Sequence, residues 1–215
     1  MERFTITVDL RTPAIISMLT LDGLLGAILF DDLQDVDKAH KAIPLRCSDG
    51  LYHASVAQTV GVCEAGKYTL IAGLRATHDL DVSQIKQAKD GNPHRAIGLT
   101  RRSDFGNVLN SYGTIMANSL QWHAEGDADR VLELLEEVQF IGKKRTAGFG
   151  QVQGWRLTES VLDGISDASG MPLRPVPLTM WHGDTNAVQA DAAWRPAYWI
   201  PQHRAICAVP SEVGR

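Results

Sequence analysis

The chain contains few cysteines, and they lie far apart. Only Cys47, Cys63 and Cys207 occur in its 215 residues, and no CxxC pair is present. This scarcity excludes a disulfide framework and a zinc ribbon, and it is typical of a reduced, cytoplasmic protein. The paired acids at 31–32 and 35–37 do not follow an EF-hand pattern. We therefore expect neither a metal nor a cofactor.

An excess of positive charge and a long apolar run are also lacking. The chain carries 21 Lys and Arg against 25 Asp and Glu, a net charge of −4. A bulk polycation is excluded, so any contact with nucleic acid must use local basic patches. The longest uncharged stretch, 105–124, is interrupted by polar side chains throughout. We expect no membrane-spanning segment and no membrane partner.

The first part of the chain shows a strand pattern followed by a helix pattern. Residues 4–11 alternate strictly between apolar and polar, which predicts a half-buried strand. Apolar residues then recur at helical spacing over 21–29, and Thr20 is placed to cap the helix. The helix is expected to end near Phe30, because the acids at 31–32 would oppose the negative end of the helix dipole.

Further elements follow the same kind of pattern. The turn sequence Ser48-Asp49-Gly50 predicts a hairpin between 44–47 and 51–60. A second helix is expected after Asp127, which is placed to cap it. Strands are expected over 68–76, 111–123 and 151–159. The order β-α-β-β-α-β predicts an α+β protein with a ferredoxin-like (RRM-like) domain over residues 1–160.

Two segments stand outside this domain plan. Residues 77–110 are polar, basic and weakly periodic, so we interpret them as an excursion inserted into the domain. Residues 161–215 are rich in proline and tryptophan. They predict an irregular C-terminal extension made of short extended pieces. It is expected to pack on the domain through Trp181, Trp194 and Trp199.

The segment 142–150 is a basic, glycine-rich loop and the most informative motif of the chain. Over residues 138–158 there are four basic residues and no acid, in a chain with an overall negative charge. Glycines let a backbone approach a ligand closely, and exposed N–H groups can then hold phosphate oxygens. The candidate RNA-binding residues of this loop are Gly142, Lys143, Lys144, Arg145, Gly148, Phe149 and Gly150.

The loop does not match the phosphate-binding motifs of nucleotide enzymes. The order GxxxxGK[ST] is absent, and the glycine spacing is wrong for a dinucleotide fingerprint. A strand, not a helix, is expected after it. An exposed turn with solvated charges remains the alternative interpretation.

A second basic patch lies in the excursion. Arg95, Arg101 and Arg102 are its candidate contacts with a nucleic-acid backbone, and two lysines and His94 lie near them in sequence. An ordinary solvated loop is the alternative.

Histidine is the usual base of a metal-independent ribonuclease, and the chain has seven. None has a spacing that singles it out. His53, within the expected strand that begins at Leu51, is the best candidate for a catalytic residue, although a structural histidine fits the pattern better. We therefore expect no enzymatic activity.

Two segments together resemble a known superfamily. They are the sequence LDGLLGAILF at 21–30 and the sequence GKKRTAGFG at 142–150, which follows the second helix pattern. The chain resembles the RAMP superfamily of CRISPR-associated proteins over residues 1–160. Within it, the chain is most similar to the Cas-five-type subunits, and among these to the type IV version, the third Csf subunit.

The resemblance implies a non-catalytic subunit that binds the guide RNA (crRNA). Such a subunit caps the 5′-handle end of an effector ribonucleoprotein. The glycine loop would contact the handle, and the excursion would be the inserted β-hairpin thumb that folds over the guide. A Cas-seven-like backbone subunit and a large or small subunit would be its protein partners, with target DNA near the PAM (protospacer-adjacent motif) as a further contact.

Two other functions stay open from the residues alone. The first is a metal-independent endoribonuclease that processes CRISPR repeat RNA. The second is a small-molecule enzyme or protein-binding module of the same fold.

Overall fold

The computed structural model describes residues 1–72 and 108–211. The chain divides into two compact units. We call residues 1–66 with 114–215 the main unit, and residues 67–113 the inserted unit. The chain enters the inserted unit along strand β4 (Gln58–Ala72) and leaves it along strand β5 (Val108–Gly126).

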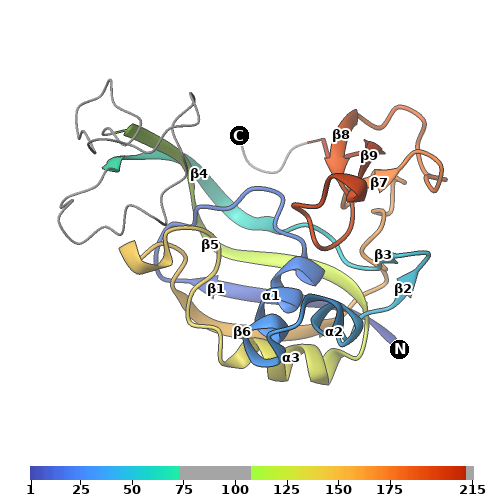
Figure 1. Ribbon diagram of the computed structural model, residues 1–215, viewed down its shortest axis with the longest axis horizontal. Coiled ribbons are helices and arrows are strands. Elements are labelled where there is room, and N and C mark those ends of the chain that lie inside the picture. The colour runs from blue at the N-terminus through green and yellow to red at the C-terminus, as the bar shows by residue number, and fades with distance from the viewer. Residues whose placement is uncertain (73–107, 212–215) are drawn as a thin grey trace, which may run out of the picture. The chain divides into compact units, whose positions relative to one another are not determined.

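A sheet of four strands, in the order β4-β5-β1-β6, forms the framework of the main unit (Figure 1). Strand β1 (Glu2–Leu10) pairs antiparallel with β5 on one side and with β6 (Val152–Glu159) on the other. The alternation of apolar and polar residues at 4–11 gives the predicted half-buried strand. Phe4, Ile6 and Val8 are buried, and the residues between them point to the opposite face.

Helices cover one face of this sheet (Figure 1). They are α1 (Leu21–Leu33), α2 (Val36–Lys41) and α3 (Ala128–Glu136). The predicted caps are confirmed, because the side chain of Thr20 accepts the N–H of Gly23 and that of Asp127 accepts the N–H of Arg130. The core between helices and sheet is one cluster of buried side chains. Its largest members include Phe4, Ile6, Leu21, Leu25, Leu120, Trp122, Val131 and Leu135.

Helix α1 is longer than expected, and its predicted end near Phe30 is wrong. The helix runs one turn further, and Gln34 ends it in the left-handed conformation with φ 51°. The Gln34 side-chain amide donates to the carbonyl oxygens of Asp31 and Phe30, at 2.8 and 3.2 Å. This cap satisfies carbonyls of the last turn. Asp31 and Asp32 are exposed, so solvent weakens their repulsion with the dipole.

The predicted hairpin is confirmed, but it is short. Strands β2 (Cys47–Ser48) and β3 (Leu51–Tyr52) pair antiparallel around Asp49 and Gly50, which have φ of 53° and 84°. Two positive φ values in a row are what a tight hairpin turn requires. The expected continuation of β3 to residue 60 is wrong, because β4 begins at Gln58 and is one strand up to Ala72.

The C-terminal extension contains its own sheet of three strands. Strands β7 (Val176–Pro177), β9 (Arg204–Ala208) and β8 (Gln189–Ala193) lie in that order and pair antiparallel. Short 3₁₀ turns occur at Arg145–Ala147 and Pro201–His203. Trp194 packs beside the small core of this sheet. Trp199 is 76% exposed, so the expectation that it packs on the domain is wrong.

The chain is thus an α+β protein with mostly antiparallel strands. Within residues 1–72 and 108–211, no helix has the length and apolar character that crossing a bilayer requires.

Candidate nucleic-acid interface

The two ends of the glycine loop, residues 142–150, lie side by side in the main unit. Phe140 and Gln151 form a bridge across its base, and the N–H of Ile141 donates to the carbonyl of Gly150 at 2.9 Å. Three glycines have positive φ: Gly142 at 80°, Gly148 at 85° and Gly150 at 70°. Lys144 has a positive φ as well, at 58°. The loop therefore has four residues in the left-handed region, which glycine adopts most readily.

Two of these glycines are required by the chain itself. A Cβ on Gly142 would lie 2.6 Å from the carbonyl oxygen of Ile15, and a Cβ on Gly150 would lie 2.0 Å from that of Ile141. A Cβ on Gly148 would meet nothing within 4 Å. The close approach at Gly142 and Gly150 is therefore to the protein's own backbone. Of the three positive-φ glycines of this loop, only Gly148 has open space beside it.

The glycine loop is held against the segment that follows β1. The hydroxyl of Thr12 donates to the carbonyl of Gly148 at 2.7 Å and accepts the N–H of Gln151 at 2.9 Å. The N–H of Gly150 donates to Pro13, and the N–H of Lys143 donates to Ile15. These bonds fix the position of the loop on the sheet edge.

This anchoring changes how the loop could bind a phosphate. The N–H groups of Lys143 and Gly150 are used by the anchor, and those of Ala147 and Gly148 donate within the loop, to Lys144 and Arg145. The expected cradle of exposed amides is wrong for these four groups. The exposed basic side chains are therefore the main source of positive charge for an anion at this loop.

Lys143 and Arg145 are exposed and supply that charge. Arg156, the fourth basic residue of the 138–158 segment, lies outside this set, because its guanidinium forms an ion pair with Asp9 at 2.7 Å. The Ser119 hydroxyl and this guanidinium together hold the pKa of Asp9 below its ordinary value, against the effect of burial. The basic charge therefore concentrates on the loop.

Arg11 is a further basic residue near the loop, and sequence reasoning missed it. It is exposed, and its backbone N–H donates to the carbonyl of Gln151, directly after the loop, at 2.9 Å. The signal that could have found it is topological. If β1 pairs with the strand after the loop, the residue that directly follows β1 lies beside the loop.

The sheet face opposite the helices is polar. Side chains of β5, β1 and β6 form rows across it, because directly paired residues share a face. The rows are His123–Thr5–Thr158, Gln121–Thr7–Arg156 and Ser119–Asp9–Gly154. None of these residues is Phe, Tyr or Trp, whereas RRM sheets bind RNA by stacking bases on several aromatic side chains. The one aromatic ring in the rows is that of His123, which is half-buried and lies 2.8 Å from the Thr5 hydroxyl through Nδ1. These rows offer mainly hydrogen bonds and an ion pair.

The candidates of the second basic patch cannot be placed. Arg95, Arg101 and Arg102 fall within residues 73–107, outside the described part of the chain. The described ends of the inserted unit are parts of β4 and β5, where the hydroxyls of Thr69 and Ser111 are 3.1 Å apart.

His53 lies in a crowded ionic cluster. Its Nε2 is 3.1 Å from the hydroxyl of Ser48, and its Nδ1 is 3.5 Å from Oδ2 of Asp163. The side chain is 12% exposed. The contact with His53, with smaller help from the N–H of Ile165 and against the effect of burial, holds the pKa of Asp163 at about 2. This geometry fits a structural joint between β3 and the residues that follow β6.

Glu125 completes this cluster. Its carboxylate accepts hydrogen bonds from Arg46 at 2.7 Å and from Arg3 at 3.2 Å. Burial opposes ionisation, but the two guanidinium groups outweigh it and lower the pKa of Glu125. One ligand atom each of His53, Glu125 and Asp163 lies within 4.8 Å of the others. Because arginines occupy both oxygens of Glu125, the arrangement fits an ion-pair network better than a cation site.

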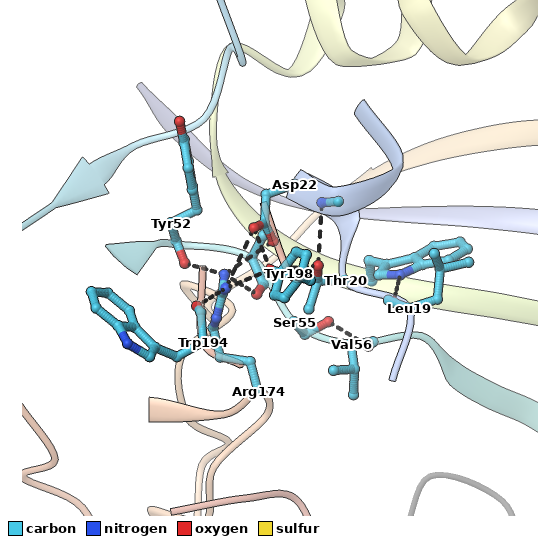
Figure 2. A network of polar contacts seen from close by, with 12 residues as sticks. Leu19, Thr20, Asp22, Tyr52, Ser55, Val56, Arg174, Trp194 and Tyr198 are labelled. Carbon is cyan, nitrogen blue, oxygen red and sulfur yellow. Dashed lines mark hydrogen bonds and ion pairs between the residues drawn. The ribbon is translucent and has the colours of Figure 1, made fainter. Parts of the chain in front are cut away.

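The start of α1 contains a buried ion pair that sequence reasoning missed (Figure 2). Asp22 and Arg174 are both 0% exposed, and the Arg174 Nη1 lies 3.1 Å from Oδ1 of Asp22. Arg174 also donates to the carbonyl oxygens of Tyr52, Ala54 and Trp194. Its charge is therefore balanced by one carboxylate and several carbonyl dipoles.

Tyr198 links this pair to the N-cap of α1. Its hydroxyl donates to Oδ2 of Asp22 at 2.6 Å and accepts from Thr20 at 2.8 Å. Burial raises the pKa of Tyr198 far above its ordinary value, so the hydroxyl keeps its proton. A Cβ on Gly23 would lie 3.0 Å from the Thr20 hydroxyl oxygen and 3.1 Å from the Tyr198 ring, so a side chain there would crowd these contacts. The Asp22–Arg174–Tyr198 network thus fastens the extension to the first helix.

Comparison with known proteins identifies the family. The family model for CRISPR type IV associated protein Csf3 matches residues 73–210. The matched region includes α3, the glycine loop, β6, Arg174, Tyr198 and the three-stranded sheet. The C-terminal extension, which carries no motif recognised from sequence, is therefore part of the family's common region. No curated protein matches the chain. The match covers more than half of the chain, which therefore belongs to the Csf3 family of type IV CRISPR-associated proteins.

Proposed function

We propose that the chain is a non-catalytic, guide-RNA-binding subunit. It caps the 5′-handle end of a type IV effector ribonucleoprotein and touches target DNA near the PAM. The observation that carries this proposal is the glycine loop. It presents Lys143 and Arg145 to solvent from a backbone anchored at Thr12, Pro13 and Ile15. A loop held in one conformation binds with a smaller loss of entropy than a mobile one.

The strand order supports a ferredoxin-like plan of the RAMP kind. In chain order the main elements are β1, α1, β4, β5, α3 and β6, and the sheet order is β4-β5-β1-β6. This is β-α-β-β-α-β with β1 and β5 in the centre of the sheet, and the hairpin β2-β3 is inserted after the first helices. The glycine loop then lies between the last helix and the last strand, as in the proposed relatives.

The charge distribution supports RNA contact at this loop. The chain has a net charge of −4, yet residues 138–158 contain no acid. Affinity from phosphate contacts depends on local neutralisation, so a small basic surface is sufficient when protein neighbours also hold the subunit. Those neighbours would be the other Csf subunits, namely a Cas-seven-like backbone subunit and a large or small subunit.

The surroundings of His53 favour binding over catalysis. A general base must reach the proton that it removes, and His53 is enclosed by Ser48 and Asp163. No observation favours the endoribonuclease alternative, and cleavage assays distinguish the two functions.

The test is a binding and cleavage assay with the repeat-derived RNA. The purified chain is incubated with this RNA in the absence of metal and run on native and denaturing gels. We expect a shifted, intact RNA, and an affinity about tenfold or more lower for the triple variant Lys143→Ala/Lys144→Ala/Arg145→Ala. The matched control is Lys38→Ala/Lys41→Ala, which removes two exposed lysines of α2.

The outcomes separate the alternatives. Equal affinity of the loop variant and the control would reject the loop as the RNA contact. If the unmodified chain cuts the RNA and the His53→Ala variant leaves it intact, the protein is a processing nuclease.

A further inference from the structure

Helix α1 has two apolar sides, and only one of them is packed in the core. Leu21, Leu25 and Leu29 are buried against the sheet. On the outer side, Ala27 is exposed and Phe30 is 37% exposed. A surface helix normally carries polar residues on its outer side, as α3 does with its exposed acids, and a helix that is apolar all round is normally covered. The outer side of α1 is therefore the kind of surface that a partner covers.

This outer side forms the floor of a groove of about 940 Å³. Gly23, Gly26 and Ala27 keep the floor low because they have small or no side chains. The walls are the end of α3, the edge of the glycine loop and residues 196–199. Trp199 lies on this last wall with 76% of its surface exposed. Exposed tryptophan beside a concave apolar surface is typical of energetically important contacts in protein interfaces.

The rim of the groove carries more acids than bases. Asp31, Asp32, Glu133 and Glu137 line it, against two arginines. Arg130 forms an ion pair with Glu133, and Arg145 lies on the edge that the groove shares with the glycine loop. Among the residues that the structure describes, no basic side chain forms an ion pair with the other three acids. The groove therefore combines an apolar floor with an excess of negative charge on the side away from Arg145.

We infer that this groove binds a segment of a partner protein that carries apolar anchor residues flanked by lysine or arginine. Basic flanks complement the three unpaired carboxylates, and the anchors would cover α1 and Trp199. RNA is disfavoured as the occupant of the groove, because beyond the edge at Arg145 its phosphates would meet the same carboxylates. A second copy of this chain is disfavoured as well, since a symmetric contact would bring one acidic rim against the other.

The groove is formed before binding. Tyr198 is part of its wall and is fixed to Asp22 and Thr20, and Arg174 holds the carbonyl of Trp194 at 2.8 Å. The buried network of Figure 2 therefore sets the position of residues 196–199 over α1. A wall held in this way lowers the entropy that a partner must lose on binding.

Hydrogen exchange on the full chain tests the inference. The probes are the other Csf subunits of the same locus, purified and added one at a time without RNA, and then the assembled ribonucleoprotein. One subunit is expected to slow exchange over residues 26–33 and 198–200. Trp199→Ala is expected to lower the affinity for that subunit about tenfold or more, without loss of the fold.

Neighbouring glutamates provide the matched control. Glu137 lines the groove, whereas Glu136 is also exposed at the same end of the helix but does not line it. Asp31→Asn/Asp32→Asn/Glu137→Gln is expected to weaken subunit binding about tenfold at low salt and less at high salt. Glu136→Gln is expected to leave it unchanged.

Several results would overturn the inference. They are protection of α1 by RNA alone, self-association of the chain that protects the groove, and no protection of α1 in the assembled particle. The RNA assay of the loop variants is independent of these measurements, so a failure here does not decide the proposed RNA contact.

Discussion

The glycine loop and the groove over α1 adjoin each other, and Arg145 belongs to both. Their chemistry is nevertheless opposite. The loop presents basic side chains and no acid, whereas the groove has an apolar floor and an acidic rim. A net charge of −4 describes neither surface. Under the two proposals made above, the chain assigns an RNA contact and a protein contact to adjacent surfaces by charge.

We expect the largest effect from breaking the Asp22–Arg174–Tyr198 network. This network holds one wall of the groove and contacts no part of the glycine loop. Arg174→Ala leaves the Asp22 carboxylate buried without its partner. We expect the free energy of unfolding to fall by about 3–5 kcal/mol, measured by urea unfolding. Asp22→Leu/Arg174→Met, which removes both charges, is expected to recover part of this loss. Equal losses in the single and double variants would contradict the account.

Two glycines of the loop provide a matched pair. Gly150→Ala places a Cβ against the carbonyl of Ile141, whereas Gly148→Ala meets only the strain of its positive φ. We expect Gly148→Ala to lose about 1 kcal/mol of stability and Gly150→Ala about 2 kcal/mol more. Thermal unfolding at equal concentration measures both. Equal effects would show that the anchor does not constrain the loop.

The joint between His53 and Asp163 makes stability dependent on pH. The folded pKa of Asp163, about 2, lies below its ordinary value of 3.8. Its contribution is therefore present above about pH 4 and is lost as the pH falls through 2. We expect a loss of up to about 2 kcal/mol over this range from this group. Asp163→Asn should make the stability curve flatter in acid, and an unchanged slope would contradict this assignment.

The smallest expected effect is at the anchor of the loop. Thr12→Val keeps the shape of the side chain but removes its hydrogen bonds to Gly148 and Gln151. We expect a loss of about 1 kcal/mol in stability and faster hydrogen exchange over the loop. Subunit binding at the groove should stay unchanged. A change in subunit binding without a change in loop exchange would contradict the separation of the two surfaces.

The elements that the sequence predicted correctly depend on local patterns. The alternation at 4–11, the caps at Thr20 and Asp127 and the Asp49-Gly50 turn each involve residues close in sequence. The end of α1 was predicted wrongly because a capping residue, Gln34, determines it. The spacing of apolar residues gives no information about such a cap.

The features that the sequence did not reveal depend on distant contacts. Asp22 and Arg174 are 152 residues apart, and Arg174 lies in an extension without a recognised motif. From the sequence, the glycines suggested free amides at the glycine loop, and the charge pattern suggested four basic groups there. Pairing with Pro13, Ile15 and Asp9 removes two of these amides and the charge of Arg156, and only the fold shows this pairing.

The most direct test of the division between the two surfaces is the salt dependence of RNA binding by matched variants. The triple variant Lys143→Ala/Lys144→Ala/Arg145→Ala should bind repeat-derived RNA about tenfold or more weakly. Its salt slope should be reduced by about 1.4 for the two exposed cations, at roughly 0.7 per lost phosphate contact. Asp31→Asn/Asp32→Asn/Glu137→Gln should leave both quantities unchanged. A loop variant with normal affinity and slope, or a groove variant that loses RNA binding, would contradict the account.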